Sequence, residues 1–280
     1  AMGKAVVYEI DDYALMVPHR RTLAKEGHGL DHADRDTVVA CLKEADLVTV
    51  STEALKEVYG RFNRRIVVLP NCTHPQVNIR TRPPNHTLTD RVTIGYAAAL
   101  AHGPDSALLK EVLPAVLEKH PQADFLFFGD TPKAWGGALP RTYHMDFVPI
   151  RDYYQVIQAF DIGVAPLVRN RYTRCKSPLK GFDYLGAGVA PVLSDHPVYD
   201  IFTHGVNCLK ARTRHDWVKH LSLLVESRRL REKLVGRGQE LVREYHICNH
   251  IHKWEAVYLA LWEWVQGGRR GDLERELEGK

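Results

Sequence analysis

Short runs of apolar residues alternate along the chain with longer segments in which apolar positions recur every three or four residues. The first pattern is typical of buried strands and the second of amphipathic helices. Up to residue 70, strands are predicted at 4–10, 47–50 and 66–69, and helices at 34–45 and 52–59. Alternation of strands and helices predicts a parallel sheet, here with three strands.

A polar stretch at residues 72–90, rich in Pro and Thr, interrupts this series and is typical of a linker between domains. Further strands are predicted at 92–97, 125–128, 162–165, 191–193 and near 207–209. Helices are predicted between and after them, at 105–120, 151–160, 178–187, 215–226, 230–245 and 249–265. This second series predicts a doubly wound parallel sheet, which binds ligands beyond the carboxyl ends of its strands.

The composition is that of a globular protein, since 45% of the 280 residues are hydrophobic and 26% are charged. This length fits two domains of about 150 residues each. No uncharged apolar run approaches the roughly 18 residues that span a bilayer, and the chain begins directly with a strand, so a cytoplasmic protein is expected. The five cysteines form no CxxC pair, which argues against a disulfide framework or a structural zinc site.

The formal charge of +4 arises from 38 Lys and Arg against 34 Asp and Glu. These charges are spread over many segments with acids among them, whereas a nucleic-acid-binding protein is expected to gather its cations in one stripe. The balance favours an anionic small ligand or an anionic membrane surface over a nucleic acid.

The densest group of charged residues lies between a predicted strand and a predicted helix, in the run RNRYTRCKSPLKGFD. Ser177 followed by Pro178 predicts a helix start, with the serine as N-cap. The helix dipole disfavours cations there by roughly 0.3 to 1 kcal/mol each, so Lys176 and Lys180 predict a bound anion. The two lysines form a candidate diphosphate site together with three nearby arginines, Arg169, Arg171 and Arg174. The alternative is an exposed basic loop.

Asp183 follows Lys180 by three residues and therefore lies on the same helix face. A carboxylate accepts two hydrogen bonds, which suits two adjacent ribose hydroxyls. The alternative is an exposed ion pair between Lys180 and Asp183.

A family resemblance rests on the run KSPLKGFDYLGAGVAPVLSD, with DIGVAPL before it and EYHICNHIHKWEAVY after it. These segments resemble the carboxyl-terminal half of group 1, family 4 retaining glycosyltransferases, which have the GT-B fold. The runs VVYEIDD, ADLVTVSTEAL and VVLPN resemble the later part of their amino-terminal domain. The resemblance implies an α/β, GT-B-like fold of two Rossmann-like parallel-sheet units, the N-terminal one truncated.

The expected domains are a partial acceptor-side domain with its linker at 1–85, a nucleotide-sugar-binding domain at 86–248, and a helical segment at 249–280 that crosses back to the first domain. The resemblance further implies sugar transfer from a nucleotide-diphosphate sugar of the UDP or GDP type, with retention at the anomeric carbon. It implies neither a metal nor a separate cofactor. The expected acceptor is a glycan, a lipid-linked molecule or a protein.

Residue by residue, the resemblance places Asp183 at the second Glu of the family's Glu-x7-Glu motif and Cys175 at the first, which holds the donor sugar. The departure at Cys175 leaves a second hypothesis, a catalytically weak or inactive nucleotide-sugar-binding module. His102 corresponds roughly to a basic phosphate-binding position, with a capping or surface histidine as the alternative. Phosphate contacts then fall to Ser177, Arg171, Lys176 and Lys180.

Two adjacent carboxylates, Asp11 and Asp12, end the first predicted strand, where ligand contacts are common. We expect them to bind acceptor hydroxyls or to stabilise positive charge on the sugar; the alternative is an ordinary turn. Together with Lys176 and Lys180 they are the predicted catalytic residues.

The last predicted helix carries one apolar face, which favours packing in the core. The alternative is binding to a membrane surface, because the helix is rich in Trp and is followed by Arg269 and Arg270.

The three-stranded first unit leaves a sheet edge whose backbone groups need partners. It predicts either self-association through this unit or further residues that precede the sequence.

Overall fold

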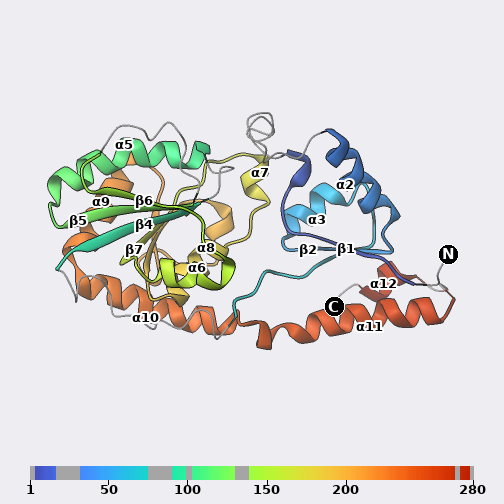
Figure 1. Ribbon diagram of the computed structural model, residues 1–280. Helices are drawn as coiled ribbons and strands as arrows, with labels where there is room; N and C mark the ends of the chain where they lie inside the picture. The colour runs from blue at the N-terminus through green and yellow to red at the C-terminus, as the bar shows by residue number, and fades with distance from the viewer. Residues whose placement is uncertain are drawn as a thin grey trace. The chain divides into compact units, whose positions relative to one another are not determined.

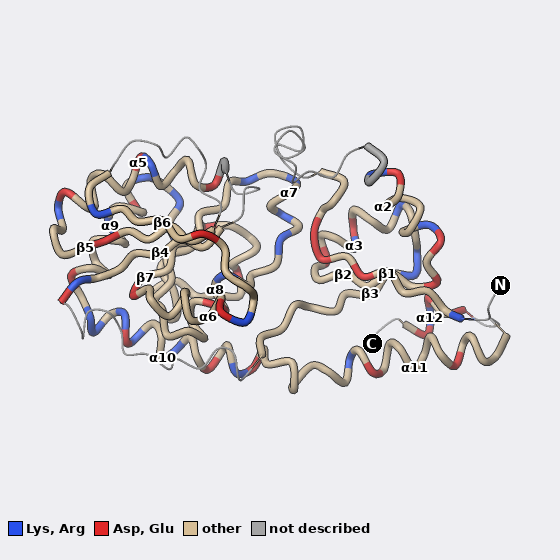
Figure 2. The backbone as a smooth tube through the Cα atoms, viewed as in Figure 1, with Lys and Arg blue, Asp and Glu red and all other residues tan. Residues whose placement is uncertain are grey.

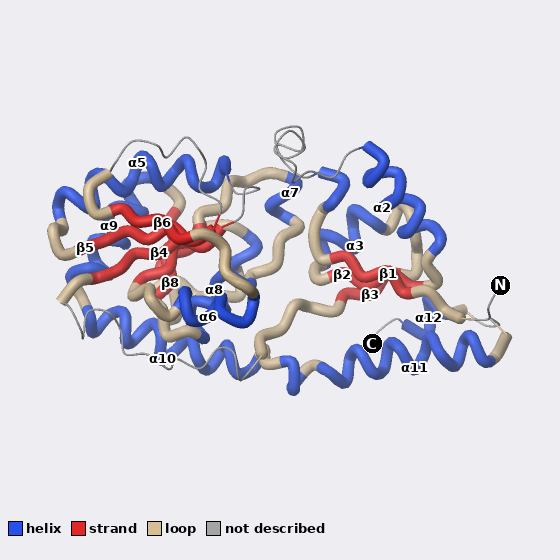
Figure 3. The backbone as a smooth tube through the Cα atoms, viewed as in Figure 1, coloured by secondary structure: helices blue, strands red, loops and turns tan. Residues whose placement is uncertain are grey.

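The chain forms two compact units in the computed structural model, which describes residues 4–16, 32–74, 90–98, 103–129, 139–268 and 272–277. The first unit combines Ala1–Cys72, Asn170–Ser177 and Ile247–Lys280, and the second combines Thr73–Arg169 and Pro178–His246. The chain therefore leaves the second unit at residue 170 and re-enters it at 178. Figure 1 labels the elements of both units, and Figure 3 separates their helices and strands.

The first unit contains a parallel sheet of three strands in the order β1-β2-β3, namely β1 (Val7–Ile10), β2 (Leu47–Val50) and β3 (Ile66–Val68). Its helical elements are η1 (Ala14–Met16), α2 (His32–Glu44), α3 (Glu53–Tyr59), α7 (Arg171–Arg174), η5 (Ile247–Asn249), α11 (Ile251–Gln266) and α12 (Leu273–Leu277). Side chains alternate along β2 because successive residues of a strand face opposite sides. Val48 and Val50 pack with α2 and α3, whereas Leu47 packs with α11 and α12. Figure 1 shows α2 and α3 on one side of this sheet and α11 and α12 on the other.

The second unit contains a parallel sheet of six strands in the order β6-β5-β4-β7-β8-β9. The strands are β4 (Val92–Ala98), β5 (Ala123–Gly129), β6 (Thr142–Met145), β7 (Ile162–Ala165), β8 (Ala190–Ser194) and β9 (Leu209–Ala211). Counted from β4, this is the 3-2-1-4-5-6 order of a Rossmann fold. The core is therefore a doubly wound sheet between two layers of helices.

Two helices cover one face of this sheet, α5 (Gly103–Lys119) and α9 (Arg214–Glu226). The opposite face is covered by α6 (Ile150–Ile157), α8 (Leu179–Gly186) and the later part of α10 (Arg228–Glu244), with η4 (Pro197–Tyr199) beside them (Figure 1). Glycine permits close packing on this face. A Cβ atom at Gly163 would lie 2.4 Å from Cγ of Tyr184, so this glycine lets α8 approach β7.

The predicted strands and helices are confirmed with small shifts of their ends, but the sequence patterns missed β6, α7 and α12. β6 is a mostly exposed edge strand and lacks the apolar run on which strand prediction depends. The prediction of Ser177 as a helix N-cap is wrong. α8 begins at Leu179, its N-cap is Pro178 without a side-chain cap, and the Ser177 hydroxyl instead accepts a hydrogen bond from Asn71 at 3.1 Å.

The predicted domain boundary near residue 85 lies outside the described residues and stays a prediction. The predicted boundary at residue 248 lies within them and also stays a prediction. Among the helices that the structure describes, none is both long and apolar enough to cross a membrane.

Candidate functional site

The strand order of the second unit reverses between β4 and β7, and a doubly wound sheet binds its ligands beyond the carboxyl ends of the strands at such a point. β4 ends at Ala98 and β7 ends at Ala165. The segment after β7 leads to α8, which returns toward β8. The candidate site of this unit is therefore the edge that contains these strand ends and the start of α8.

Asp183 lies in the second turn of α8 and is buried, with 8% of its surface exposed. Its two carboxylate oxygens accept hydrogen bonds from the hydroxyls of two neighbouring residues of α6, Tyr153 at 3.1 Å and Tyr154 at 2.9 Å. Burial raises the pKa of Asp183 to about 6, although the two tyrosine hydroxyls and the charge of Lys180 lower it. The result is a fixed, buried carboxylate whose charge depends on pH near neutrality.

Lys180 lies one turn earlier on α8, and its Nζ lies 4.9 Å from the ring centroid of Tyr96 on β4. This geometry is a cation–π contact. The Tyr96 hydroxyl is buried and has no hydrogen-bond partner among the described residues. Burial also raises the pKa of this hydroxyl, so it remains a neutral donor. Together, α8 and β4 place an ammonium group, a carboxylate and a neutral phenol near this edge of the sheet, with Tyr96 packed on the α5 face and Asp183 against α6 on the opposite face.

A cavity of about 430 Å³ lies at the carboxyl ends of β7, β8 and β9. Its lining combines apolar side chains with charged and polar groups, namely Leu108, Leu167, Val168, Arg169, Ser194, Asp195, Ala211, Arg212 and Trp217. The loop after β7 is held in place because Asp105 of α5 accepts a hydrogen bond from the Val168 backbone at 2.7 Å. The Arg169 guanidinium donates to the Asp195 carbonyl at 2.7 Å, which places a cation at this edge.

The first unit contains a second group of predicted site residues. Lys176 donates to Oδ2 of Asp12 at 2.8 Å, and its Nζ lies 4.6 Å from the ring centroid of Tyr172. Burial lowers the pKa of Lys176, but the Asp12 carboxylate and the Tyr172 hydroxyl outweigh it, so the net pKa is raised. The other carboxylate oxygen of Asp12, Oδ1, is buried and has no hydrogen-bond donor among the described residues.

The backbone around Asp12 is fixed by the first unit's core. The Tyr59 hydroxyl donates to the Asp12 carbonyl at 2.8 Å and accepts from the Ala14 backbone at 3.0 Å. Asp11 is exposed, and its carbonyl accepts a hydrogen bond from Ser51. The two adjacent aspartates therefore occupy different surroundings, and Asp12 contacts another predicted site residue, Lys176.

Cys175 belongs to the core of the first unit and is only 1% exposed. Its thiol donates to the Arg171 carbonyl, and its own carbonyl accepts from the Thr52 hydroxyl at 3.2 Å. Burial raises the pKa of the thiol. Arg171 itself is exposed on α7, a basic stretch visible in Figure 2. The predicted ligand contacts of these two residues and of Ser177 stay predictions.

The predicted site residues thus fall into two groups. Asp12 and Lys176 meet in the first unit, and Lys180 and Asp183 share a helix in the second. His102 lies outside the described residues. The sequence patterns did not predict Tyr153 and Tyr154 as partners of Asp183, although the doubled tyrosine in a predicted amphipathic helix was a visible signal of inward-facing hydroxyls.

The sequence profile of the family described as glycosyl transferase-like matches residues 108–254, which is more than half of the chain and includes Lys180 and Asp183. A comparison with curated proteins gives no match.

Solved structures of glycosyltransferases are similar in fold. A variant of TarM from S. aureus, in complex with Fondaparinux, alpha-GlcNAc-glycerol and UDP, has a TM-score of 0.66 and 14% identity over 91% of this chain and 50% of that one. HepE from Anabaena, in complex with UDP-glucose, has a TM-score of 0.67 and 13% identity over 94% of this chain and 72% of that one. This chain therefore spans half the length of TarM.

A third structure is the C-terminal domain of LpcC, a group 1 family glycosyl transferase from Francisella tularensis. Its TM-score is 0.51 and its identity 17%, over 62% of this chain and 99% of that domain. At these identities the comparisons describe the fold, and they confirm the expected α/β, GT-B-like class with parallel sheets.

Proposed function

The chain belongs to the glycosyl transferase-like family, and from this premise we propose that it transfers a sugar from a nucleotide-diphosphate sugar to an acceptor. The proposed donor is of the UDP or GDP type, the reaction retains the configuration at the anomeric carbon, and neither a metal nor a cofactor takes part. HepE and TarM were solved with UDP-glucose and UDP, so the uridine donors are the first to test.

The observation that carries this proposal is the pair Lys180 and Asp183 on α8 of the Rossmann-like second unit. Both Asp183 oxygens are oriented by tyrosine hydroxyls, but a carboxylate has about four acceptor positions, so it can also accept from ribose hydroxyls. Lys180 lies one turn closer to the helix start, which has no side-chain cap. An ammonium group and a helix N-terminus both stabilise a diphosphate.

In the proposed reaction, the bond between the anomeric carbon and the diphosphate oxygen breaks, and negative charge develops on the leaving phosphate. The acceptor hydroxyl oxygen forms a bond to that carbon on the same face, and the hydroxyl proton passes to the leaving phosphate. Lys180 is positioned in advance to stabilise this charge, which lowers the barrier without reorganisation during the reaction. We assign Asp183 to the ribose and the buried Oδ1 of Asp12 to an acceptor hydroxyl. Lys176 orients the Asp12 carboxylate through its 2.8 Å hydrogen bond.

The test is a panel of UDP- and GDP-sugars, first for thermal stabilisation of the protein and then for release of nucleoside diphosphate with candidate acceptors. A ligand that binds only the folded state raises the apparent stability in proportion to the logarithm of its concentration over Kd. We expect one donor to stabilise the protein and to be consumed, and the anomer of the product, read by NMR, to be that of the donor. Absence of stabilisation by every nucleotide sugar would contradict the proposal.

A second candidate function is nucleotide-sugar binding with weak or no catalysis. It is favoured by one observation: the residue that corresponds to the family's first Glu is Cys175, which is buried in the core of the first unit. Saturable donor binding without turnover, over a broad set of glycan, lipid-linked and protein acceptors, would support this candidate.

A further inference from the structure

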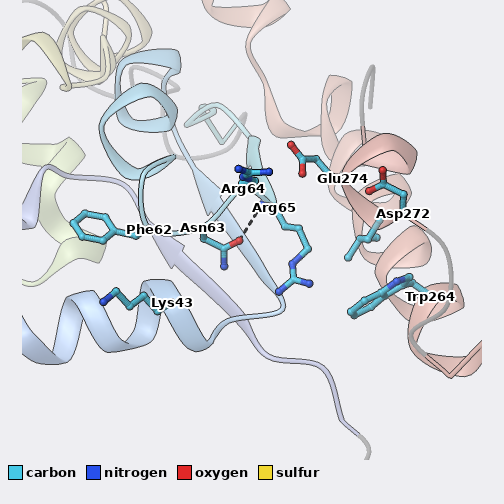
Figure 4. A pocket seen from close by; sticks show the side chains of 9 residues that line it. Lys43, Phe62, Asn63, Arg64, Arg65, Trp264, Asp272 and Glu274 are labelled. Atoms are coloured by element: carbon cyan, nitrogen blue, oxygen red, sulfur yellow. Dashed lines mark hydrogen bonds between the residues drawn. The ribbon is translucent and has the colours of Figure 1, made fainter.

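A cavity of about 380 Å³ lies wholly within the first unit, between the start of β3 and the C-terminal helices (Figure 4). Its wall on the sheet side is formed by the end of α2 and the turn before β3, and its opposite wall by α11 and α12. The lining residues are Lys43, Phe62, Asn63, Arg64, Arg65, Trp264, Asp272, Leu273 and Glu274. None of them belongs to either group of site residues described above.

Three cations line the sheet side of this cavity, Lys43, Arg64 and Arg65. Two acids line the other wall, Asp272 and Glu274, yet none of the three cations forms an ion pair within the described part of the chain. Nε of Arg65 is buried and lacks a hydrogen-bond acceptor there. A buried donor without an acceptor costs stability, and an anion bound on this side of the cavity would supply that acceptor.

Asn63 holds the backbone of the turn that carries the two arginines. Its side-chain amide donates to the carbonyls of Leu42 and Ala45, both at 2.9 Å, and its side-chain oxygen accepts from the Arg65 backbone at 2.9 Å (Figure 4). The Arg65 guanidinium carbon lies 5.5 Å from the ring centroid of Trp264. Because Asn63 is buried and its hydrogen bonds hold the Arg65 backbone, the turn that carries Arg64 and Arg65 is preorganised.

The opposite wall restricts the ligand. Asp272 caps α12 by accepting from the Arg275 backbone, whereas Glu274 is exposed and forms no ion pair within the described part. Two carboxylates beside a bound anion repel additional negative charge but accept hydrogen bonds from ammonium or hydroxyl groups. The cavity therefore combines a cationic side with an acidic side.

We propose that this cavity is a second binding site, for a small ligand that carries a phosphate or carboxylate group on one side and an ammonium or hydroxyl group on the other. Arg64, Arg65 and Lys43 bind the anionic group by charge-assisted hydrogen bonds, and Glu274 binds the donor group. The site is independent of the nucleotide site proposed for the second unit.

The test is calorimetry on the full chain with two probes, inorganic phosphate and O-phosphoethanolamine. We expect both to bind, the second more tightly. Arg64→Gln and Lys43→Gln should each weaken binding about tenfold or more, the usual effect of losing a charged hydrogen bond. Both side chains are exposed, so their replacement leaves the fold intact. Lys56→Gln, on α3 of the same unit and outside the cavity, is the matched control.

Glu274→Gln tests the acidic wall separately, because it should strengthen binding of inorganic phosphate and weaken binding of O-phosphoethanolamine. UDP binding should be the same in the parent and in Arg64→Gln, which separates this site from the proposed function. The proposal is overturned if neither probe gives saturable binding, or if Arg64→Gln and Lys43→Gln bind both probes as the parent does.

Discussion

At the scale of single residues, Asp183 is a carboxylate whose surroundings disfavour its charge. Burial raises its pKa from 3.8 to about 6, even though two tyrosine hydroxyls and Lys180 act in the opposite direction. Between these two pKa values, the Asp183 carboxyl group is protonated in the folded protein and ionised in the unfolded chain. Linkage then requires that the free energy of unfolding fall as the pH rises through this range.

We predict that the contribution of Asp183 to stability is fully present below about pH 4 and is lost as the pH rises through about 6. The two pKa values correspond to a change of about 3 kcal/mol. Urea unfolding of the parent and of Asp183→Asn, at a series of pH values, measures this difference, because the asparagine cannot titrate. If the free energies of unfolding of the parent and of the variant change in parallel from pH 4 to pH 7, the carboxyl group is not desolvated in the folded state.

The location of Asp183 could be predicted from its spacing to Lys180 and from the family resemblance, but its partners could not. Tyr153 and Tyr154 are about 30 positions away and meet it only because α6 and α8 cover the same face of the sheet. The ion pair between Asp12 and Lys176 joins residues 164 positions apart. Local spacing carries no information about such contacts, so the sequence placed Lys176 with Lys180 instead.

At the scale of elements, the segment Asn170–Ser177 is structurally part of the first unit although its neighbours in sequence belong to the second. Tyr172 and Cys175 contribute to the first unit's core, and the Arg174 guanidinium pairs with Glu57 at 2.6 Å. Sequence patterns indicated a single basic loop before α8. They missed α7 because four helical residues are too few to show a periodicity.

This packing predicts the effect of restoring the family's glutamate at position 175. Cys175→Glu places a carboxylate in an apolar core, so we expect a loss of about 3 kcal/mol or more in the free energy of unfolding and no gain in sugar transfer. Cys175→Ala, which removes only a thiol, is the control and should cost much less. A Cys175→Glu protein that is as stable as the parent and transfers sugar faster would contradict the placement of this side chain.

At the scale of the whole molecule, the alternation of strands and helices was sufficient to predict two parallel-sheet units, because buried parallel strands are near-continuous apolar runs. The order of the strands was not predictable from that alternation, because each later strand can be added to the sheet on either side of the first strand. In the first unit, β1 and β3 each pair only with β2 among the described residues. The expected self-association through this sheet stays a prediction that light scattering can test.

Calorimetry with UDP and GDP measures whether the second unit binds the nucleotide through Lys180 and Asp183. Lys180→Gln and Asp183→Ala should each weaken nucleoside diphosphate binding by about 1 to 3 kcal/mol, the range for hydrogen bonds to charged groups. Lys233→Gln, an exposed lysine on α10 of the same unit, should bind as the parent does. Equal affinity in the parent and in both site variants would exclude a nucleotide site formed by Lys180 and Asp183.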